Sequence, residues 1–328
     1  MNYDEAKLKF TSLFNHEMND EQMREFLLGI TLDEYTCVDV IAAAAEVMRE
    51  FSIPLPIPEE LRLNAIDIVG TGGDKIGSFN ISSTVALLVA SCGATVAKHG
   101  SRSITSNSGS ADMFEALGVR LDLSTQNTAK LLEETGFTFM FAGNHHPAMR
   151  FIMPIRKSIS DKTIFNILGP LTNPAGVQKS MLGVFDKAFV PKMLEALKIN
   201  GATSAIVVSS KEGMDEISIS NVTYAAQLRE GVMREFEIDP QEYGIKKTPI
   251  KAIVGGNAGQ NAQILKNIFD SSATDAQRDI VLINTATSLV VDGLARDIQD
   301  GLEMAREAIT NARAKKKLKQ IIEISNKL

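Results

Sequence analysis

A short apolar run that ends in a glycine-rich loop constrains this chain more than any other feature. Residues 66–69 read Ile-Asp-Ile-Val, and residues 70–74 continue as Gly-Thr-Gly-Gly-Asp. Glycines let the backbone turn tightly and come close to a ligand, because no Cβ stands in the way. The amides of such a loop, with those that open the next helix, form a nest that can hold phosphate. The pattern therefore predicts a strand, a loop and a helix that together bind a phosphate-bearing ligand.

This loop differs from the two commonest phosphate-binding loops. It lacks the lysine of the G-x-x-x-x-G-K-[ST] arrangement, and its spacing is not the Rossmann G-x-G-x-x-G. The simpler alternative is a strand-to-helix turn that is built from small residues. Asn80 and Ser82 could likewise be plain N-caps, since these residue types favour that position. The segments that follow decide between these interpretations.

The composition excludes several classes of protein. The chain has 328 residues, of which 44% are hydrophobic and 23% charged, and a net charge of −6. This length suits one large or two unequal domains, and the acidic balance argues against broad binding to nucleic acid or a membrane surface. No signal-peptide pattern and no bilayer-spanning apolar run is present, so we expect a cytoplasmic protein. Cys37 and Cys92 have no metal-site spacing and are expected to be buried thiols in a reducing compartment.

The pattern of apolar residues divides the chain into a helical beginning and an alternating remainder. Helical spacing covers residues 4–14, 19–30 and 32–50, and prolines at 54, 56 and 58 then suggest a linker. The expected strands are 65–69, 95–98, 137–142 and 204–209, with a hairpin of 224–228 and 232–237. The expected helices are 82–91, 111–117, 124–135, 190–198, 261–269, 276–292 and 298–324. This order predicts an α/β fold, in which helices flank a mostly parallel central sheet and a smaller all-α domain lies at the N-terminus.

A second polar segment follows the expected strand 95–98. Residues 98–103 read Lys-His-Gly-Ser-Arg-Ser, and residues 108–112 read Ser-Gly-Ser-Ala-Asp. Ligands of open parallel sheets bind outside the carboxyl ends of the strands. We therefore predict a second phosphate site, with Lys98 as a point charge and Ser110 as a donor at a helix N-terminus. A surface ion pair is the simpler interpretation of Arg102, and a satisfied core histidine is that of His99.

A third segment follows the expected strand 204–209 and carries two adjacent carboxylates, Asp215 and Glu216. Mg²⁺ prefers oxygen ligands and usually shares them with substrate phosphates. Such a pair alone could be a solvated turn, but beside two phosphate loops the metal interpretation is preferable. Two phosphate sites and magnesium suggest a ligand with a pyrophosphate and a further phosphate.

Taken together, these segments resemble the anthranilate phosphoribosyltransferases. The matching residues are 70–74, 80–82, 98–100, 108–112, 146–149, 163–174 and 215–216. They occur in the family's order and spacing, and the similarity runs along the whole chain. The resemblance implies a small helical domain of residues 1–63, which a returning segment near 160–180 completes, and an α/β phosphoribosyl-binding domain of residues 64–328. It also implies a homodimer that forms through the helical domains.

The resemblance further implies a reaction and the residues that serve it. The reaction is the Mg²⁺-dependent transfer of 5-phosphoribosyl from phosphoribosyl pyrophosphate to the amino group of anthranilate, in tryptophan biosynthesis, with inversion at C1. Phosphoribosyl pyrophosphate would be held by Gly70, Thr71, Gly73, Asp74, Asn80, Ser82, Ser83, Lys98 and Ser110. Anthranilate would be bordered by Gly70, His99, Gly100, Ser101, Arg150 and Lys162. The implied Mg²⁺ ligands are Ser82, Asp215 and Glu216, and His99 is by position the candidate general base.

Three positions depart from the family's usual pattern. Ser101 stands where an asparagine is usual, Lys162 where an arginine precedes Thr-x-Phe-Asn, and Ser83 where a threonine is usual. A single ammonium group recognises a carboxylate less specifically than the two-pronged guanidinium does. We therefore expect intact phosphate and metal sites but an altered affinity or identity of the acceptor.

Two other functions fit part of this pattern. A pyrimidine-nucleoside phosphorylase shares the general fold and a similar Lys-His pair. Against this function, we expect no additional C-terminal domain of the kind found in that enzyme, and the pair Asp215 and Glu216 would have no explanation there. A non-catalytic relative that binds nucleic acid would need a basic surface, which the net acidic composition does not favour.

Overall fold

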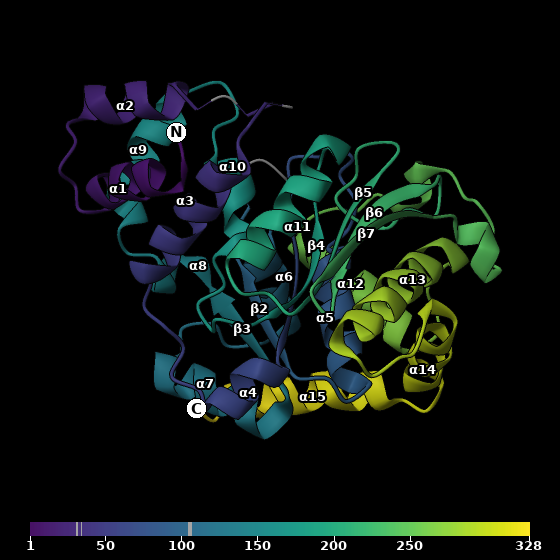
Figure 1. Ribbon diagram of the computed structural model, residues 1–328. Coiled ribbons are helices and arrows are strands. Elements are labelled where there is room, and N and C mark those ends of the chain that lie inside the picture. The colour runs from purple at the N-terminus through teal and green to yellow at the C-terminus, as the bar shows by residue number, and fades with distance from the viewer. Residues whose placement is uncertain (31, 34, 104–106) are drawn as a thin grey trace.

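The computed structural model describes residues 1–30, 32–33, 35–103 and 107–328. A seven-stranded sheet runs through the larger part of the molecule in the order β3-β2-β1-β4-β5-β6-β7 (Figure 1). The strands are β1 (Ile66–Gly70), β2 (Val96–Gly100), β3 (Phe137–Phe141), β4 (Lys179–Gly183), β5 (Ser204–Ser210), β6 (Thr223–Arg229) and β7 (Val232–Ile238). Neighbours from β3 to β5 pair in parallel, and β6 pairs antiparallel with β5 and β7. The mostly parallel sheet and its terminal hairpin confirm the predicted fold class.

Strand β4 is the one that the sequence pattern does not predict. It lies between β1 and β5 and pairs with both, so that Gly183 stands opposite Gly70 on one side and Val208 on the other. Its five residues, Lys-Ser-Met-Leu-Gly, are too few and too mixed to give a clear alternation. The strand matters because it brings the carboxyl ends of β1 and β5 to the same edge of the sheet.

Helices cover both faces of the sheet. Alternate residues of β5 enter different clusters, with Ile206 and Val208 in one and Ala205 and Val207 in the other. Burial on both faces is typical of parallel sheets in α/β proteins. The first cluster includes residues of α5 (Ile81–Ser91), α6 (Ser110–Leu117), α12 (Ala258–Phe269), α13 (Asp275–Asp292), α14 (Ile298–Thr310) and α15 (Arg313–Ser325). The second includes α11 (Val190–Ile199), and a third, smaller cluster includes residues of α7 (Thr125–Thr135) and β3.

The N-terminal helices form a lobe that a later segment joins, and the core of this lobe is continuous with that on one face of the sheet. The lobe contains α1 (Tyr3–Phe14), α2 (Asp20–Leu28) and α3 (Val38–Glu50). Helix α9 (Met149–Ser158) packs on α2 and α10 (Phe165–Leu168) packs on α3, as Figure 1 shows by the teal α9 among purple helices. The segment that returns to the lobe thus begins near residue 149, and the predicted domain boundary between residues 63 and 64 stays a prediction.

Short elements connect these parts. They are α4 (Glu59–Asn64), α8 (Ala142–His145), η1 (Gly169–Leu171), η2 (Lys187–Phe189), η3 (Pro240–Tyr243) and η4 (Ile250–Ile253). In the part of the chain that the structure describes, no helix combines the length and the apolar character that crossing a bilayer requires.

Several local predictions were wrong. The expected helix 298–324 is divided into α14 and α15, because Ala312 adopts a left-handed conformation with φ of 56°. Cys37 is exposed and Cys92 is half-buried, so neither is the fully buried thiol that we expected. The helix expected over 32–50 begins at Val38, and residue 34 of that prediction lies outside the described residues.

Candidate functional site

The loop after β5 packs directly on the ends of β1 and β4. A Cβ added to Gly70 would overlap Oδ2 of Asp215, and one added to Gly183 would overlap the carbonyl oxygen of Asp215. Backbone atoms cannot move aside as a flexible side chain can, so only glycine fits at position 183. The sequence signal of the glycine-rich loop therefore has a structural cause, which is the close approach of an acidic residue from a distant loop.

The same acidic residue binds the glycine-rich loop. The amide of Gly72 donates to Oδ2 of Asp215 at 2.7 Å, and Gly72 and Gly73 have φ of 66° and 79°, a conformation that favours glycine. Burial, with the nearby charge of Asp74, raises the pKa of Asp215 to about 6. Burial also raises the pKa of Asp74. The two carboxyl groups thus lie together at the end of β1.

Glu216 connects this acidic pair to the start of α5 and to β2. The amide of Ser82 donates to Oε1 of Glu216 at 3.0 Å, and Oγ of Ser82 lies 3.5 Å from Nζ of Lys98. Lys98 is buried and donates to the carbonyl oxygen of Ile68. Burial and the charge of Asp215 raise the pKa of Glu216 well above its usual range. Burial lowers the pKa of Lys98, and the surrounding carboxylates oppose that shift.

The donor set of this cluster fits a magnesium ion. Asp215 and Glu216 lie near one ammonium group, that of Lys98, and Asp74 lies beside Asp215. Burial and the charges of neighbouring carboxylates raise the pKa values of Asp215 and Glu216, so their ionised forms lack sufficient counter-charge. Among the described residues, no group of three or more His, Cys, Asp or Glu side chains could hold a metal ion by itself. Mg²⁺ commonly takes one or two carboxylates and completes its shell with waters and substrate phosphates. The cluster is therefore suited to Mg²⁺ that binds together with an anionic substrate.

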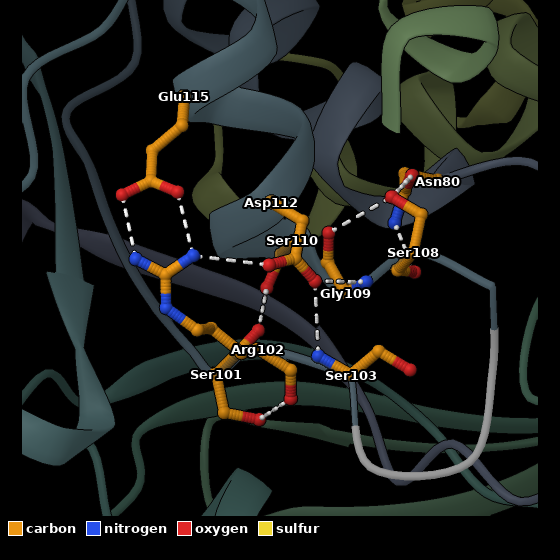
Figure 2. Close-up of polar contacts among 9 residues, drawn as sticks. All are labelled: Asn80, Ser101, Arg102, Ser103, Ser108, Gly109, Ser110, Asp112 and Glu115. Atoms are coloured by element: carbon orange, nitrogen blue, oxygen red, sulfur yellow. Dashed lines mark hydrogen bonds and ion pairs between the residues drawn. The ribbon is translucent and has the colours of Figure 1, made fainter. Parts of the chain in front are cut away.

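Asp112 joins Ser103 and Gly109, the two sides of the loop between β2 and α6, which we call the neck of that loop (Figure 2). Its Oδ2 accepts the amides of Ser103 at 3.1 Å and Gly109 at 2.8 Å. A Cβ at Gly109 would overlap the backbone of the opposite side of the neck. The closed neck places Ser110 at the N-terminus of α6, beside Gly100. A Cβ added to Gly100 would overlap Oγ of Ser110.

Arg102 forms surface ion pairs, which was the simpler interpretation of this residue in the sequence. Its two terminal nitrogens each lie 2.6 Å from an oxygen of Glu115, and Nη1 also donates to Asp112 at 3.1 Å (Figure 2). The guanidinium carbon lies 5.5 Å from the centroid of the Phe141 ring. Arg102 therefore stabilises the neck rather than offering its charge to a ligand.

His99 lies at the end of β2 and is buried. Its backbone amide donates to Oδ1 of Asp67 at 3.2 Å, and its ring centroid lies 5.1 Å from that of His146. Burial, then the neighbouring His146, holds the pKa of His99 well below its usual range, so the imidazole is neutral at pH 7. Among the described residues, Nε2 of His99 has no hydrogen-bond partner. This is not a fully satisfied core histidine, and its free nitrogen could contact a polar ligand.

Lys162 lies beside the glycine-rich loop. Its Nζ is 3.2 Å from the centroid of the Phe185 ring, and the amide of Phe185 donates to Oγ1 of Thr71 at 3.2 Å. Burial, then the charge of Lys75, lowers the pKa of Lys162. The segment between α9 and α10 thus contributes a cation to the edge of the sheet.

The remaining predicted residues lie less centrally. Arg150 is exposed with its guanidinium carbon 4.5 Å from the centroid of the Phe151 ring, and within the described ranges no hydrogen bond or ion pair joins it to the acidic cluster. Ser101 is exposed and its Oγ donates to the carbonyl oxygen of Arg102. Ser83 is buried, and in the described chain its hydroxyl has no partner.

Two further residues of the site region were missed. Oδ2 of Asp67 accepts a hydrogen bond from Asn173 at 2.7 Å, and the same Nδ2 donates to the carbonyl oxygen of Ala97 at 2.8 Å. Burial raises the pKa of Asp67 to about 6, although Lys98 opposes the shift. An aspartate within an otherwise apolar strand was the available signal, since a buried acid requires partners.

The chain is similar to known proteins along nearly its whole length. Residues 62–315 match the glycosyl transferase family, a/b domain. An anthranilate phosphoribosyltransferase of Xanthobacter autotrophicus is 42% identical over 325 residues, which cover 99% of this chain and 93% of that relative. The crystal structure of anthranilate phosphoribosyltransferase from Thermus thermophilus matches with a TM-score of 0.93 at 33% identity, over 99% of this chain and 96% of that one. The Saccharomyces cerevisiae anthranilate phosphoribosyltransferase in complex with PRPP and Mg has a TM-score of 0.87 at 26% identity, over 99% and 93%.

The raised pKa of Asp215 predicts a dependence of stability on pH. A carboxyl group whose pKa is about 6 when folded and about 4 when unfolded favours the folded state below pH 4 and loses that contribution as the pH rises to 6. Asp215→Asn removes the charge and can still accept from Gly72. In metal-free protein at pH 7.5 we expect its melting temperature to exceed that of the wild type by about 2 °C or more.

Differential scanning fluorimetry with a chelator, between pH 4.5 and 7.5, measures this difference, which should shrink toward the acid end. Asp161→Asn, at an exposed position, is the matched control and should leave the melting temperature unchanged. A lower melting temperature for Asp215→Asn at pH 7.5 would contradict the charge crowding described above.

Proposed function

The chain belongs to the anthranilate phosphoribosyltransferase family, and we propose that the acidic cluster at the carboxyl edge of its sheet binds phosphoribosyl pyrophosphate with Mg²⁺. The enzyme transfers phosphoribosyl from phosphoribosyl pyrophosphate to the amino group of anthranilate. The observation that carries the site proposal is the convergence of Asp74, Lys98 and Glu216, which come from three loops or strands that are distant in sequence.

The amides of Thr71, Gly72 and Ser82 already donate to protein oxygens. The substrate phosphates would therefore meet the remaining amides of the glycine-rich loop and of the first turn of α5, together with the N-terminus of α6. The proposed ligands of phosphoribosyl pyrophosphate are those of the sequence prediction, namely Gly70, Thr71, Gly73, Asp74, Asn80, Ser82, Ser83, Lys98 and Ser110. Support comes from the hydroxyl of Ser83, which has no partner among the described residues, and from the placement of Ser82 between Glu216 and Lys98.

The reaction forms a bond from the anthranilate nitrogen to C1 of the ribose and breaks the bond from C1 to the pyrophosphate oxygen. Attack opposite the leaving group inverts C1, and the amine loses a proton as its nitrogen becomes bonded to carbon. Lys98 would stabilise the negative charge that develops on pyrophosphate. Bound Mg²⁺, held by Asp215, Glu216 and Ser82, would neutralise part of the same charge.

The acceptor would lie between β2 and the segment that leads into α10. We propose that it is bordered by Gly70, Gly100 and His99 on one side and Lys162 on the other, with Ser101 and Arg150 farther out. A neutral His99 could accept the proton of the amine, and this role is supported by its Nε2, for which the described part of the chain supplies no partner. The weakly basic aromatic amine needs chiefly alignment and exclusion of water, which the buried walls would supply.

The other two functions are less well supported. The relatives that match nearly the whole chain bear the name of the transferase, which sets the pyrimidine-nucleoside phosphorylase aside. The Lys98 ammonium lies among carboxylates rather than on a basic surface, and Arg102 is paired. Neither residue therefore favours a nucleic-acid-binding role.

We also propose a homodimer that forms through the N-terminal lobe, in a cytoplasmic protein. Leu8 of α1 is 73% exposed, and Leu28 at the end of α2 is also exposed. A partner that packs on this lobe would cover these apolar side chains. A second copy of the chain is the occupant that the family resemblance implies.

The metal assignment predicts a loss of turnover in Asp215→Ala and Glu216→Ala variants. Each should reduce Mg²⁺-dependent consumption of anthranilate by at least about 100-fold, because the developing pyrophosphate charge loses its counter-ion. The decay of anthranilate fluorescence with phosphoribosyl pyrophosphate and Mg²⁺ measures the rate. Glu212→Ala on the same loop should retain activity if folded, and wild-type rates in the two test variants would refute the assignment.

The acceptor assignment predicts that Lys162→Arg and Ser101→Asn lower the KM for anthranilate. A guanidinium can bind a carboxylate through two hydrogen bonds, so we expect a decrease of about three-fold or more for Lys162→Arg. The KM for phosphoribosyl pyrophosphate should stay within about two-fold. An unchanged KM for anthranilate in both variants and in the double variant would place these residues outside the acceptor site.

The dimer proposal predicts a solution mass of twice the 35.6 kDa of one chain. Light scattering after size-exclusion chromatography measures this mass. Leu8→Glu should give a monomer, because it places a charge in the apolar contact. Leu294→Glu, at an exposed turn of the larger part, is the control and should stay dimeric. A monomeric wild type, or a dimeric Leu8→Glu variant, would contradict the proposed interface.

A further inference from the structure

A segment from the last third of the chain forms one wall of the phosphate loop. The amide of Phe79 donates to the carbonyl oxygen of Ile253 at 3.1 Å, and that of Gly255 donates to Gly77 at 2.9 Å. A Cβ at Gly255 would lie 2.5 Å from Cα of Phe79, so the two backbones are in direct contact. Residues 253–256 therefore hold the approach to α5 in place, and they lead into α12.

Asn261 extends this contact from backbone to side chain. It lies on α12, is 2% exposed, and accepts the amide of Gly256 on its Oδ1 at 2.8 Å. A backbone amide can only donate, so this bond fixes which end of the Asn261 side chain is the oxygen. The other end, Nδ2, donates to Oδ1 of Asn80 at 2.8 Å.

The orientation of Asn80 is fixed from its other side as well. Its Nδ2 donates to the carbonyl oxygen of Ser108 at 3.1 Å, and its Oδ1 also accepts from Oγ of Ser108 at 3.1 Å. Figure 2 shows these two contacts between Asn80 and Ser108. If the Asn80 amide were rotated by 180°, its oxygen would face the carbonyl oxygen of Ser108, and its NH₂ group would face the NH₂ group of Asn261. The series of hydrogen bonds from Gly256 through Asn261 and Asn80 to Ser108 therefore allows only one orientation of each of the two amide side chains.

We infer that Asn261 is a positioning residue, which holds the Asn80 amide so that its remaining N–H is available to an oxygen of phosphoribosyl pyrophosphate. Within the described residues, Asn80 donates only one of its two Nδ2 hydrogens, to Ser108. This inference rests on the proposed function, because it takes Asn80 as a ligand of that substrate. It assigns a role in substrate binding to α12, which supplies none of the residues proposed above.

Asn261→Asp tests the inference with almost no change of shape. Its carboxylate still accepts from Gly256 but cannot donate to Asn80, so the Asn80 amide loses its fixed orientation. We expect the KM for phosphoribosyl pyrophosphate to rise about tenfold, as follows from the loss of one buried hydrogen bond. The KM for anthranilate and kcat at saturating substrate should stay within about two-fold. Asn267→Asp, on the exposed side of the same helix, is the matched control and should leave all three constants unchanged.

A second variant covers the case in which a buried carboxylate prevents folding. Asn261→Ala removes both the donor to Asn80 and the acceptor of the Gly256 amide without adding charge, and it should raise the same KM by a similar factor. A purely structural role would instead lower the melting temperature while the KM for phosphoribosyl pyrophosphate stayed unchanged in the folded fraction.

The double variant with Asn80→Ala separates the inference from the proposed function. Asn80→Ala alone should raise the KM for phosphoribosyl pyrophosphate, and Asn261→Asp should add little to it, because both changes remove the same contact. If Asn80→Ala raises this KM and neither Asn261 variant does, the inference is wrong and the proposed site stands. If Asn80→Ala leaves it unchanged, Asn80 is not a ligand, and both its assignment in the proposed function and the inference fail.

Discussion

The contact of Asp215 with the ends of two strands is the constraint on which the rest of the site depends. Gly70 and Gly183 have no side chains, and the loop after β5 occupies the space where their Cβ atoms would be. This brings Asp215 within hydrogen-bond distance of Gly72 and places Glu216 at the first turn of α5. A larger residue at either strand end would displace the acidic pair from the loop.

Charge explains why such a cluster belongs to a binding site rather than to a stable core. Asp67, Asp215 and Glu216 lie around the buried ammonium group of Lys98, and burial raises the pKa of each of these carboxyl groups. A fold selected for stability alone would place apolar residues here, since uncompensated buried charge is unfavourable. A divalent cation and a polyanionic substrate that shared the cluster, as we propose, would compensate this charge.

The sequence predicted most of the sheet and the residues that meet at its edge, because both follow from local patterns. Glycines and short polar motifs mark the ends of strands, and parallel strands bring those ends together. Strand β4 was missed because five mixed residues carry no clear period, and the division at Ala312 was missed because alanine gives no signal of a left-handed turn. The contacts of Asn261 with Asn80, and of Asn173 with Asp67, join segments more than 100 residues apart, which no local pattern can reveal.

A crystal structure with phosphoribosyl pyrophosphate and Mn²⁺ would test the central claim most directly, since Mn²⁺ takes the same oxygen ligands as Mg²⁺ and has a measurable anomalous signal. We expect an anomalous peak coordinated by Asp215 and Glu216 and by oxygens of the substrate, with the pyrophosphate against residues 70–74 and Lys98. A substrate bound elsewhere, or a metal ion that has neither carboxylate among its ligands, would contradict the account.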